Sequence, residues 1–185
     1  ITDTHKETIN LEKNSVLNYT LKPNAVARLF FHDRAGVDVK INVELEENAS
    51  CEMYGLFHNE GKDPKVVTTV IHKGKKSKCD QDFRFVNKEC DSSFEGKITI
   101  PKNITGCESH MLNKNLLLDD ESFAFSKPEL DIKNDDTICS HGATTGPLDQ
   151  EQVFYLKSRG IPEPEAIEML IDAFYQDIKN RMEVA

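Results

Sequence analysis

The stretch from Asp136 to Gly146, DTICSHGATTG, holds the closely spaced cysteine and histidine of this sequence, Cys139 and His141. Side chains two positions apart on an extended backbone leave the same face. A thiol and an imidazole on one face can bind iron or copper, or support a nucleophile. Two ligands are at most half of a metal site, so the spacing alone equally fits a small buried cysteine beside a hydrogen-bonded histidine.

The composition narrows the class of protein. A length of 185 residues predicts one domain, or one domain with an appendage. A net charge of −9 argues against a nucleic-acid partner, which needs clustered basic residues. No apolar run approaches the ~20 residues of a membrane helix, and no signal-peptide pattern is visible. Five cysteines without close pairing favour reduced thiols, so we expect a cytoplasmic protein. The first residue is Ile1, so we expect a preceding segment, whose role the sequence does not indicate.

The elements that must position this pair are short β-favouring runs separated by turn formers such as Pro23-Asn24 and Asn59-Glu60-Gly61. They predict a mainly β protein. The expected strands are 16–21, 25–32, 37–45, 50–58, 66–72, 79–86, 94–100 and 107–112, with 116–118 as a further strand and 123–125 and 129–132 as the last coil, bent at Lys127-Pro128.

The spacing of the turns indicates which β architecture this is. The Asn-Gly and Asp-Gly dipeptides of tight hairpins are absent from the sequence. Instead, turn formers recur at nearly regular intervals, at Asn24, Asn48, Lys76 and Ile104. A period of about 24–28 residues with two strands per repeat favours a parallel β-helix flattened into two sheets.

Three cysteines follow the same period. Cys51, Cys79 and Cys107 are equally spaced along the chain, which predicts a vertical ladder inside the β-helix. We interpret the row as small apolar side chains that fill the interior, although a thiolate track for sulfur or metal is the alternative.

The pattern changes after Gly146, so we divide the chain into a β-helix core at 1–146 and a helical region at 147–185. Asp149 is a suitable N-cap for a first helix that Gly160 closes, and Pro162 opens a second helix. The second helix carries apolar residues at helical spacing: Ile167, Leu170, Ile171, Phe174, Ile178 and Met182. This stripe fits either a cap on the end of the β-helix or a docking face for a partner.

Two other functions fit a β-helix. A polysaccharide-active enzyme would need clustered acids, and Asp119-Asp120-Glu121 is the candidate calcium-binding run, although consecutive acids more often form a solvated turn. A purely structural binding module would bury Cys139 and His141 as inert groups.

The motif Cys139-Ser140-His141-Gly142-Ala143-Thr144 resembles the signature of the SufB/SufD family of iron–sulfur cluster assembly scaffolds, and the resemblance is dense over about 113–175. It extends through Asn115-Leu116-Leu117-Leu118, Lys127-Pro128-Glu129-Leu130, Phe154-Tyr155-Leu156 and Ser158-Arg159-Gly160-Ile161. The resemblance implies a right-handed parallel β-helix with a C-terminal helical part. It also implies a complex with SufB and the ATPase SufC, in which the ATPase docks on the helical region around Ile167, Leu170, Ile171 and Phe174.

Two positions make the chain resemble SufD rather than SufB. SufB-type proteins carry a glutamate where this chain has Gly142, and a cysteine at the position of Lys114. The resemblance therefore implies a non-catalytic scaffold without a tightly bound cofactor. His141, with Cys139, would meet transient iron or a nascent cluster at the SufB interface. A homodimer is possible for the isolated chain.

Overall fold

The computed structural model describes residues 1–183. Eleven strands and two helices follow one another along this part of the chain. They are β1 (Thr4–Leu11), β2 (Ser15–Leu21), β3 (Val26–Asp33), β4 (Val39–Leu45), β5 (Ser50–Glu60), β6 (Lys65–His72), β7 (Lys78–Lys88), β8 (Asp91–Ile100), β9 (Cys107–Leu117), β10 (Phe123–Ile132), β11 (Thr137–Pro147), α1 (Gln150–Ser158) and α2 (Glu163–Glu183).

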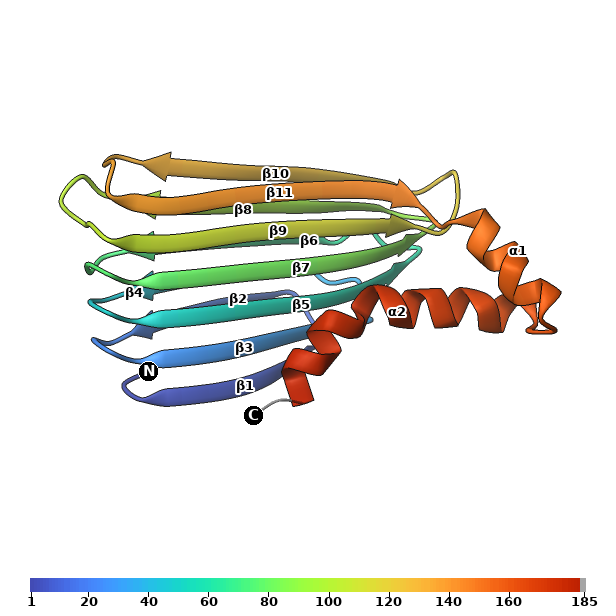
Figure 1. Ribbon diagram of the computed structural model, residues 1–185, viewed down its shortest axis with the longest axis horizontal. Helices are drawn as coiled ribbons and strands as arrows, with labels where there is room; N and C mark the ends of the chain where they lie inside the picture. The colour runs from blue at the N-terminus through green and yellow to red at the C-terminus, as the bar shows by residue number, and fades with distance from the viewer. Residues whose placement is uncertain (184–185) are drawn as a thin grey trace.

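The strands form two parallel sheets that face each other (Figure 1). The first, sheet A, has the order β1-β3-β5-β7-β9-β11, and the second, sheet B, has the order β10-β8-β6-β4-β2. Odd strands belong to one sheet and even strands to the other, so each coil contributes one strand to each. This arrangement confirms the parallel β-helix with two strands per coil and the C-terminal helical segment.

The largest differences from the predicted strands concern β1, β9 and β10. β1 was not predicted, because its residues are mostly polar and exposed. β9 extends to Leu117 and absorbs the separate strand expected at 116–118. β10 is one strand that continues through Pro128, where a bend was expected. Proline is tolerated there because β10 is an edge strand, and one side of its backbone needs no partner.

One corner of the β-helix repeats the same backbone conformation in successive coils. Asn24, Asn48, Lys76 and Gly106 have φ values of 65°, 56°, 56° and 69°. Asparagine and glycine adopt this left-handed region most readily. The Asn48 side-chain amide donates to Asn24 Oδ1 at 3.1 Å, which joins two of these corners directly.

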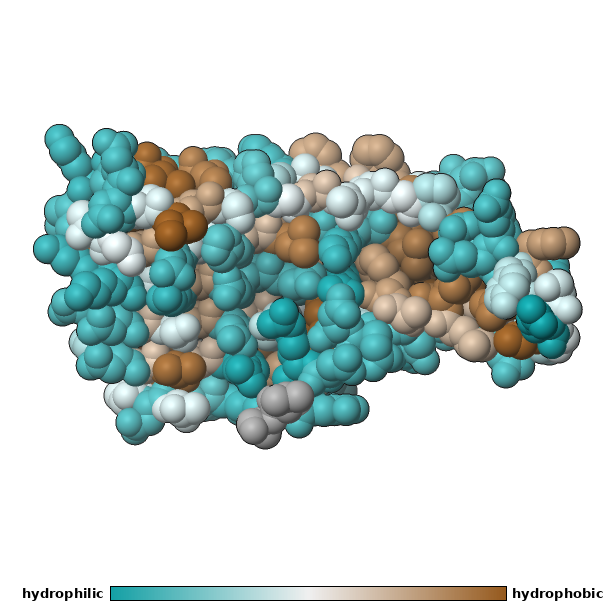
Figure 2. Space-filling view, viewed as in Figure 1, coloured by the Kyte–Doolittle hydropathy of each residue, from teal (hydrophilic) through white to brown (hydrophobic). Residues whose placement is uncertain are grey.

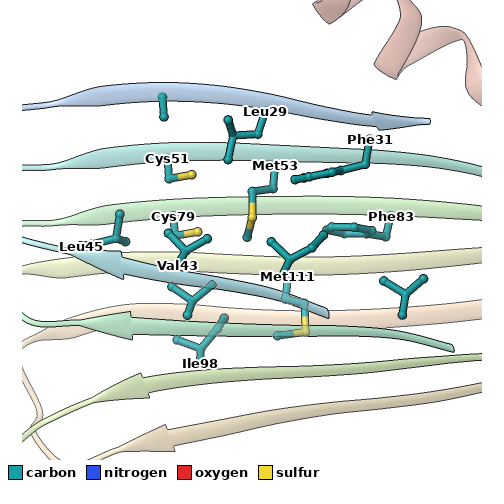
Figure 3. Close-up of a cluster of buried hydrophobic side chains, with 14 of the residues drawn as sticks. Leu29, Phe31, Val43, Leu45, Cys51, Met53, Cys79, Phe83, Ile98 and Met111 are labelled. Carbon is teal, nitrogen blue, oxygen red and sulfur yellow. The ribbon is translucent and has the colours of Figure 1, made fainter. Parts of the chain in front are cut away.

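The space between the sheets is filled by apolar side chains that stack from coil to coil (Figure 3). Phe83 lies at the centre of an aromatic group, with ring centroids 6.2 Å from Phe31, 6.1 Å from Phe57 and 5.3 Å from Phe94. These four rings are at most 1% exposed. Burial of this area is the main stabilisation of the coils.

The helices follow the last strand. Asp149 caps α1, because its carboxylate accepts the backbone N–H groups of Glu151 and Gln152, as the sequence predicts. α2 packs neither on the end of the β-helix nor away from it: it runs back across the outer face of sheet A (Figure 1). A second apolar cluster lies in this seam, and Figure 2 shows apolar side chains gathered there. Its buried members are Phe30, Tyr54, Leu56, Val86, Ile171, Tyr175 and Ile178.

Candidate functional site

β11 positions Cys139 and His141 at one end of the solenoid. It is the last strand of sheet A and pairs with β9, so that Cys139 lies beside Ser109 and His141 beside Met111. Ser109 and Met111 are buried and face the interior. Side chains at paired positions of parallel strands point to the same side, so Cys139 and His141 both leave the interior face of β11, as their spacing predicts.

The two side chains differ in exposure. Cys139 is half-buried and packs against the main core, whereas His141 is exposed, because sheet A ends at β11. Burial raises the pKa of the Cys139 thiol, and hydrogen bonds to Thr137 and Ser109 oppose this only in part. The thiol is therefore protonated at neutral pH, and a metal that binds there must displace the proton.

Two interior rows lead to this pair through the β-helix. One contains Cys51, Cys79, Ser109 and Cys139, and the other contains Met53, Gln81, Met111 and His141. Figure 3 shows Cys51 above Cys79, with Met53 beside them and Met111 lower in the picture. Both amide atoms of buried Gln81 are without a hydrogen-bond partner among residues 1–183.

The predicted ladder of Cys51, Cys79 and Cys107 is therefore wrong in its last member. Cys51 and Cys79 are paired across β5 and β7, but Cys79 is paired with Ser109 and not with Cys107. The coil that joins β7 to β9, with its turn at 101–106, is longer than the coil before it, and this moves Cys107 out of the row. Its sulfur lies 3.4 Å from Ser77 Oγ instead. All five cysteines are free.

The site offers few ligands of its own. No group of three or more His, Cys, Asp or Glu side chains suited to a metal ion occurs within residues 1–183. Met111 is the register neighbour of His141, but it is 2% exposed and its sulfur packs against Gly96 of sheet B, so it belongs to the core and not to the site. A metal at this end therefore needs further ligands from another molecule.

The acidic run Asp119-Asp120-Glu121 forms a turn. Asp119 accepts backbone N–H groups from Glu89, Glu121 and Ser122 at 2.8, 3.1 and 2.7 Å. Its oxygens are thus occupied by the local backbone, which favours the solvated-turn interpretation over a calcium site.

The predicted docking residues of α2 face two directions. Ile171 is 2% exposed in the seam with sheet A. Ile167 and Phe174 pack partly against the same cluster. Leu170 instead lines a groove of about 300 Å³ between the helices, with Tyr155 and Leu156 of α1. The docking role of these four residues stays a prediction.

The most exposed apolar side chains of this region lie on α1. Phe154 is 72% exposed and Tyr155 is 57% exposed, and Met169 of α2 is 45% exposed.

None of the helices in residues 1–183 combines the length and apolar character needed to cross a membrane.

The last strand of this solenoid presents an imidazole and a thiol from one face, and two helices follow it. The family described as "SUF system FeS cluster assembly, SufBD core domain" matches residues 7–174. The chain belongs to this SufB/SufD family of iron–sulfur cluster assembly proteins.

Named relatives agree with this assignment. The iron–sulfur cluster assembly protein SufD of Escherichia coli is 42% identical over 85 residues, 46% of this chain and 20% of that protein. An iron–sulfur cluster assembly SufBD family protein of Synechocystis sp. is 38% identical over 100 residues, 54% of this chain and 22% of that protein. A chloroplastic SufBD family protein of Arabidopsis thaliana is 26% identical over 148 residues, 76% of this chain and 26% of that protein. The chain thus spans only about a quarter or less of these relatives.

Proposed function

We propose that the chain is a SufD-like scaffold subunit that pairs with a SufB-like protein through the end formed by β10 and β11. The observation that carries the proposal is the position of His141, exposed on a terminal strand and on the same face as Cys139. A site with only an imidazole and a thiol binds iron weakly alone, and a partner that adds a thiolate or carboxylate completes it. Iron or a nascent cluster is then cargo held between subunits.

The SufD-like assignment rests on two residues. Gly142 brings no carboxylate to β11, and Lys114 brings no thiol to β9. In this proposal the sulfur is accepted by the partner, and this chain contributes the imidazole. The chain catalyses no step itself, and ATP hydrolysis belongs to a SufC-like partner in the cytoplasm.

We also propose that this ATPase docks on the helical hairpin of α1 and α2. Leu170, half-buried, is the member of the predicted stripe that lines the groove between the helices, and Phe154 and Tyr155 of α1 are exposed apolar side chains nearby. Exposed aromatic residues of this kind commonly supply most of the binding energy of an interface.

The test of the metal role is reconstitution with SufB-like and SufC-like partners. His141→Ala is expected to lower the rate of cluster formation at least about tenfold, because it removes a ligand. His110→Ala is the matched control, since His110 is also exposed but lies on the outer face of β9, where its Nδ1 is 2.7 Å from Ser140 Oγ. Cluster formation at the wild-type rate in His141→Ala would show that the metal role is wrong.

A further inference from the structure

α2 is fastened to sheet A by polar contacts as well as by apolar packing. The Tyr175 hydroxyl donates to the backbone carbonyl of Phe57 at 2.8 Å, inside the seam. Arg181 donates to the Tyr54 hydroxyl at 3.0 Å near the end of the helix. These bonds hold the second half of α2 to β5.

Arg84 makes the largest set of these contacts. Its side chain is 4% exposed, although it lies on the outer face of β7. Its guanidinium donates to both carboxylate oxygens of Asp82, at 3.3 and 2.9 Å, and to Asp177 of α2 at 3.2 Å. It also donates to the backbone carbonyl of Phe174 and lies 5.8 Å from the centre of that ring.

These contacts require a guanidinium. Burying a cation is costly unless its N–H groups are paired, and here two carboxylates, a carbonyl and a ring surround it. A lysine ammonium is a point charge on a flexible stem, and it cannot match this planar, multidentate arrangement. The arrangement therefore depends on arginine specifically, rather than on positive charge.

Arg84 contacts the second half of α2. Figure 1 shows α1 and the first turns of α2 projecting beyond the ends of the strands, while the rest of α2 bends across the sheet. Phe174 and Asp177, the residues that Arg84 contacts, lie in the second half of α2. A side chain that bonds to a carbonyl within a helix is a recognised cause of such a bend.

We propose that Arg84 is a positioning residue that couples the helical hairpin to the β-helix. It fixes the orientation of the hairpin relative to sheet A. A protein that binds the hairpin and moves it therefore also moves β7, and not only α2. The interior face of β7 carries Cys79 and Gln81, whose rows end at Cys139 and His141. This coupling rests on the proposed function, in which an ATPase docks on the hairpin.

The first arm of the test uses the chain alone. Backbone hydrogen exchange is measured for wild type, Arg84→Lys and the control Arg34→Lys, an exposed arginine whose charge reaches Tyr175 of the same seam. Arg84→Lys is expected to speed exchange of the amides of 171–182 about tenfold and to leave β5 and β7 within about twofold. Unchanged exchange in α2, or equal acceleration in the strands, would show that Arg84 does not hold α2 to sheet A.

The second arm adds SufB-like and SufC-like partners. Arg84→Lys is expected to bind the ATPase within about threefold of the wild-type affinity but to slow ATP-driven cluster assembly about fivefold or more. Wild-type assembly by a variant with a loosened α2 would overturn the coupling. A wild-type chain that does not bind the ATPase would overturn the proposed docking and the coupling together. The hydrogen-exchange result would still decide whether Arg84 holds α2 to sheet A.

Discussion

Acidification should destabilise this protein through His72, which is buried at the end of β6. The side chain is 0% exposed, and its Nδ1 lies 2.7 Å from Ser77 Oγ. That hydroxyl donates its own proton to the Gly74 carbonyl at 2.7 Å, so it accepts from His72 Nδ1–H. His72 Nε2 has no hydrogen-bond partner among the described residues. A second proton on the ring would therefore be buried without a partner.

The size of the effect follows from this burial. Desolvation lowers the pKa of His72 from 6.5 to about 4. The folded protein binds the proton more weakly than the unfolded chain, so stability is complete above pH 6.5 and falls as the pH drops towards 4. For these two pKa values the free energy of unfolding decreases by about 2 kcal/mol between pH 8 and pH 5, and by about 3 kcal/mol below pH 4.

Urea titrations at pH 8 and pH 5 would measure this loss for wild type and for His72→Gln, which cannot titrate. The variant is expected to lose about 2 kcal/mol less than wild type over this interval. His110→Gln is the control and should follow wild type. Burial also lowers the pKa values of His32 and His58, so some acid sensitivity remains in the variant. Parallel losses in wild type and His72→Gln would refute the reasoning.

Four further outcomes are expected. Glu89→Gly should raise the free energy of unfolding by about 0.5–1 kcal/mol in urea titrations, because Glu89 has a φ of 51°; destabilisation would contradict this. Phe83→Ala should lower it by about 3–5 kcal/mol, since it empties the aromatic group; a loss below about 1 kcal/mol would show that the core collapses. Iodoacetamide should modify Cys139 before Cys79 under native conditions, as peptide mass spectrometry would reveal, because only the latter is almost fully buried; equal rates would contradict the described burial. Phe154→Ala should weaken ATPase binding about tenfold or more in a titration, whereas unchanged affinity would move the docking surface elsewhere.

The repeat made most of the fold predictable. Turn formers and a long period identify a parallel β-helix, because each coil must place its polar corner above the one below. The capping of α1 by Asp149 was equally readable, since a carboxylate at that position satisfies free N–H groups.

The register was not predictable to the same degree. A period averaged over the chain conceals the longer coil between β7 and β9, and it misplaced Cys107. For the same reason the sequence did not place Met111 beside His141. The location of α2 was also not predictable, because it depends on tertiary contacts. An apolar stripe shows that one face of a helix is buried, but it does not show which element buries it. Arg84 carries no sequence signal, since a buried and an exposed arginine look alike in a sequence.

The coils of this protein grow along the chain. One row of paired positions across sheet A contains, in order, Thr4, Val26, Ser50, Lys78, Glu108 and Ile138. The interval in sequence between neighbours lengthens from coil to coil and is constant only at the end of this row. A solenoid of identical repeats can shift by one repeat and still satisfy its backbone. Here, except between the last two intervals of the row, a coil moved to its neighbour's level would be too long or too short for the position it entered. The unequal coil lengths therefore favour the native order of the coils during folding. They also disfavour the exchange of coils between molecules.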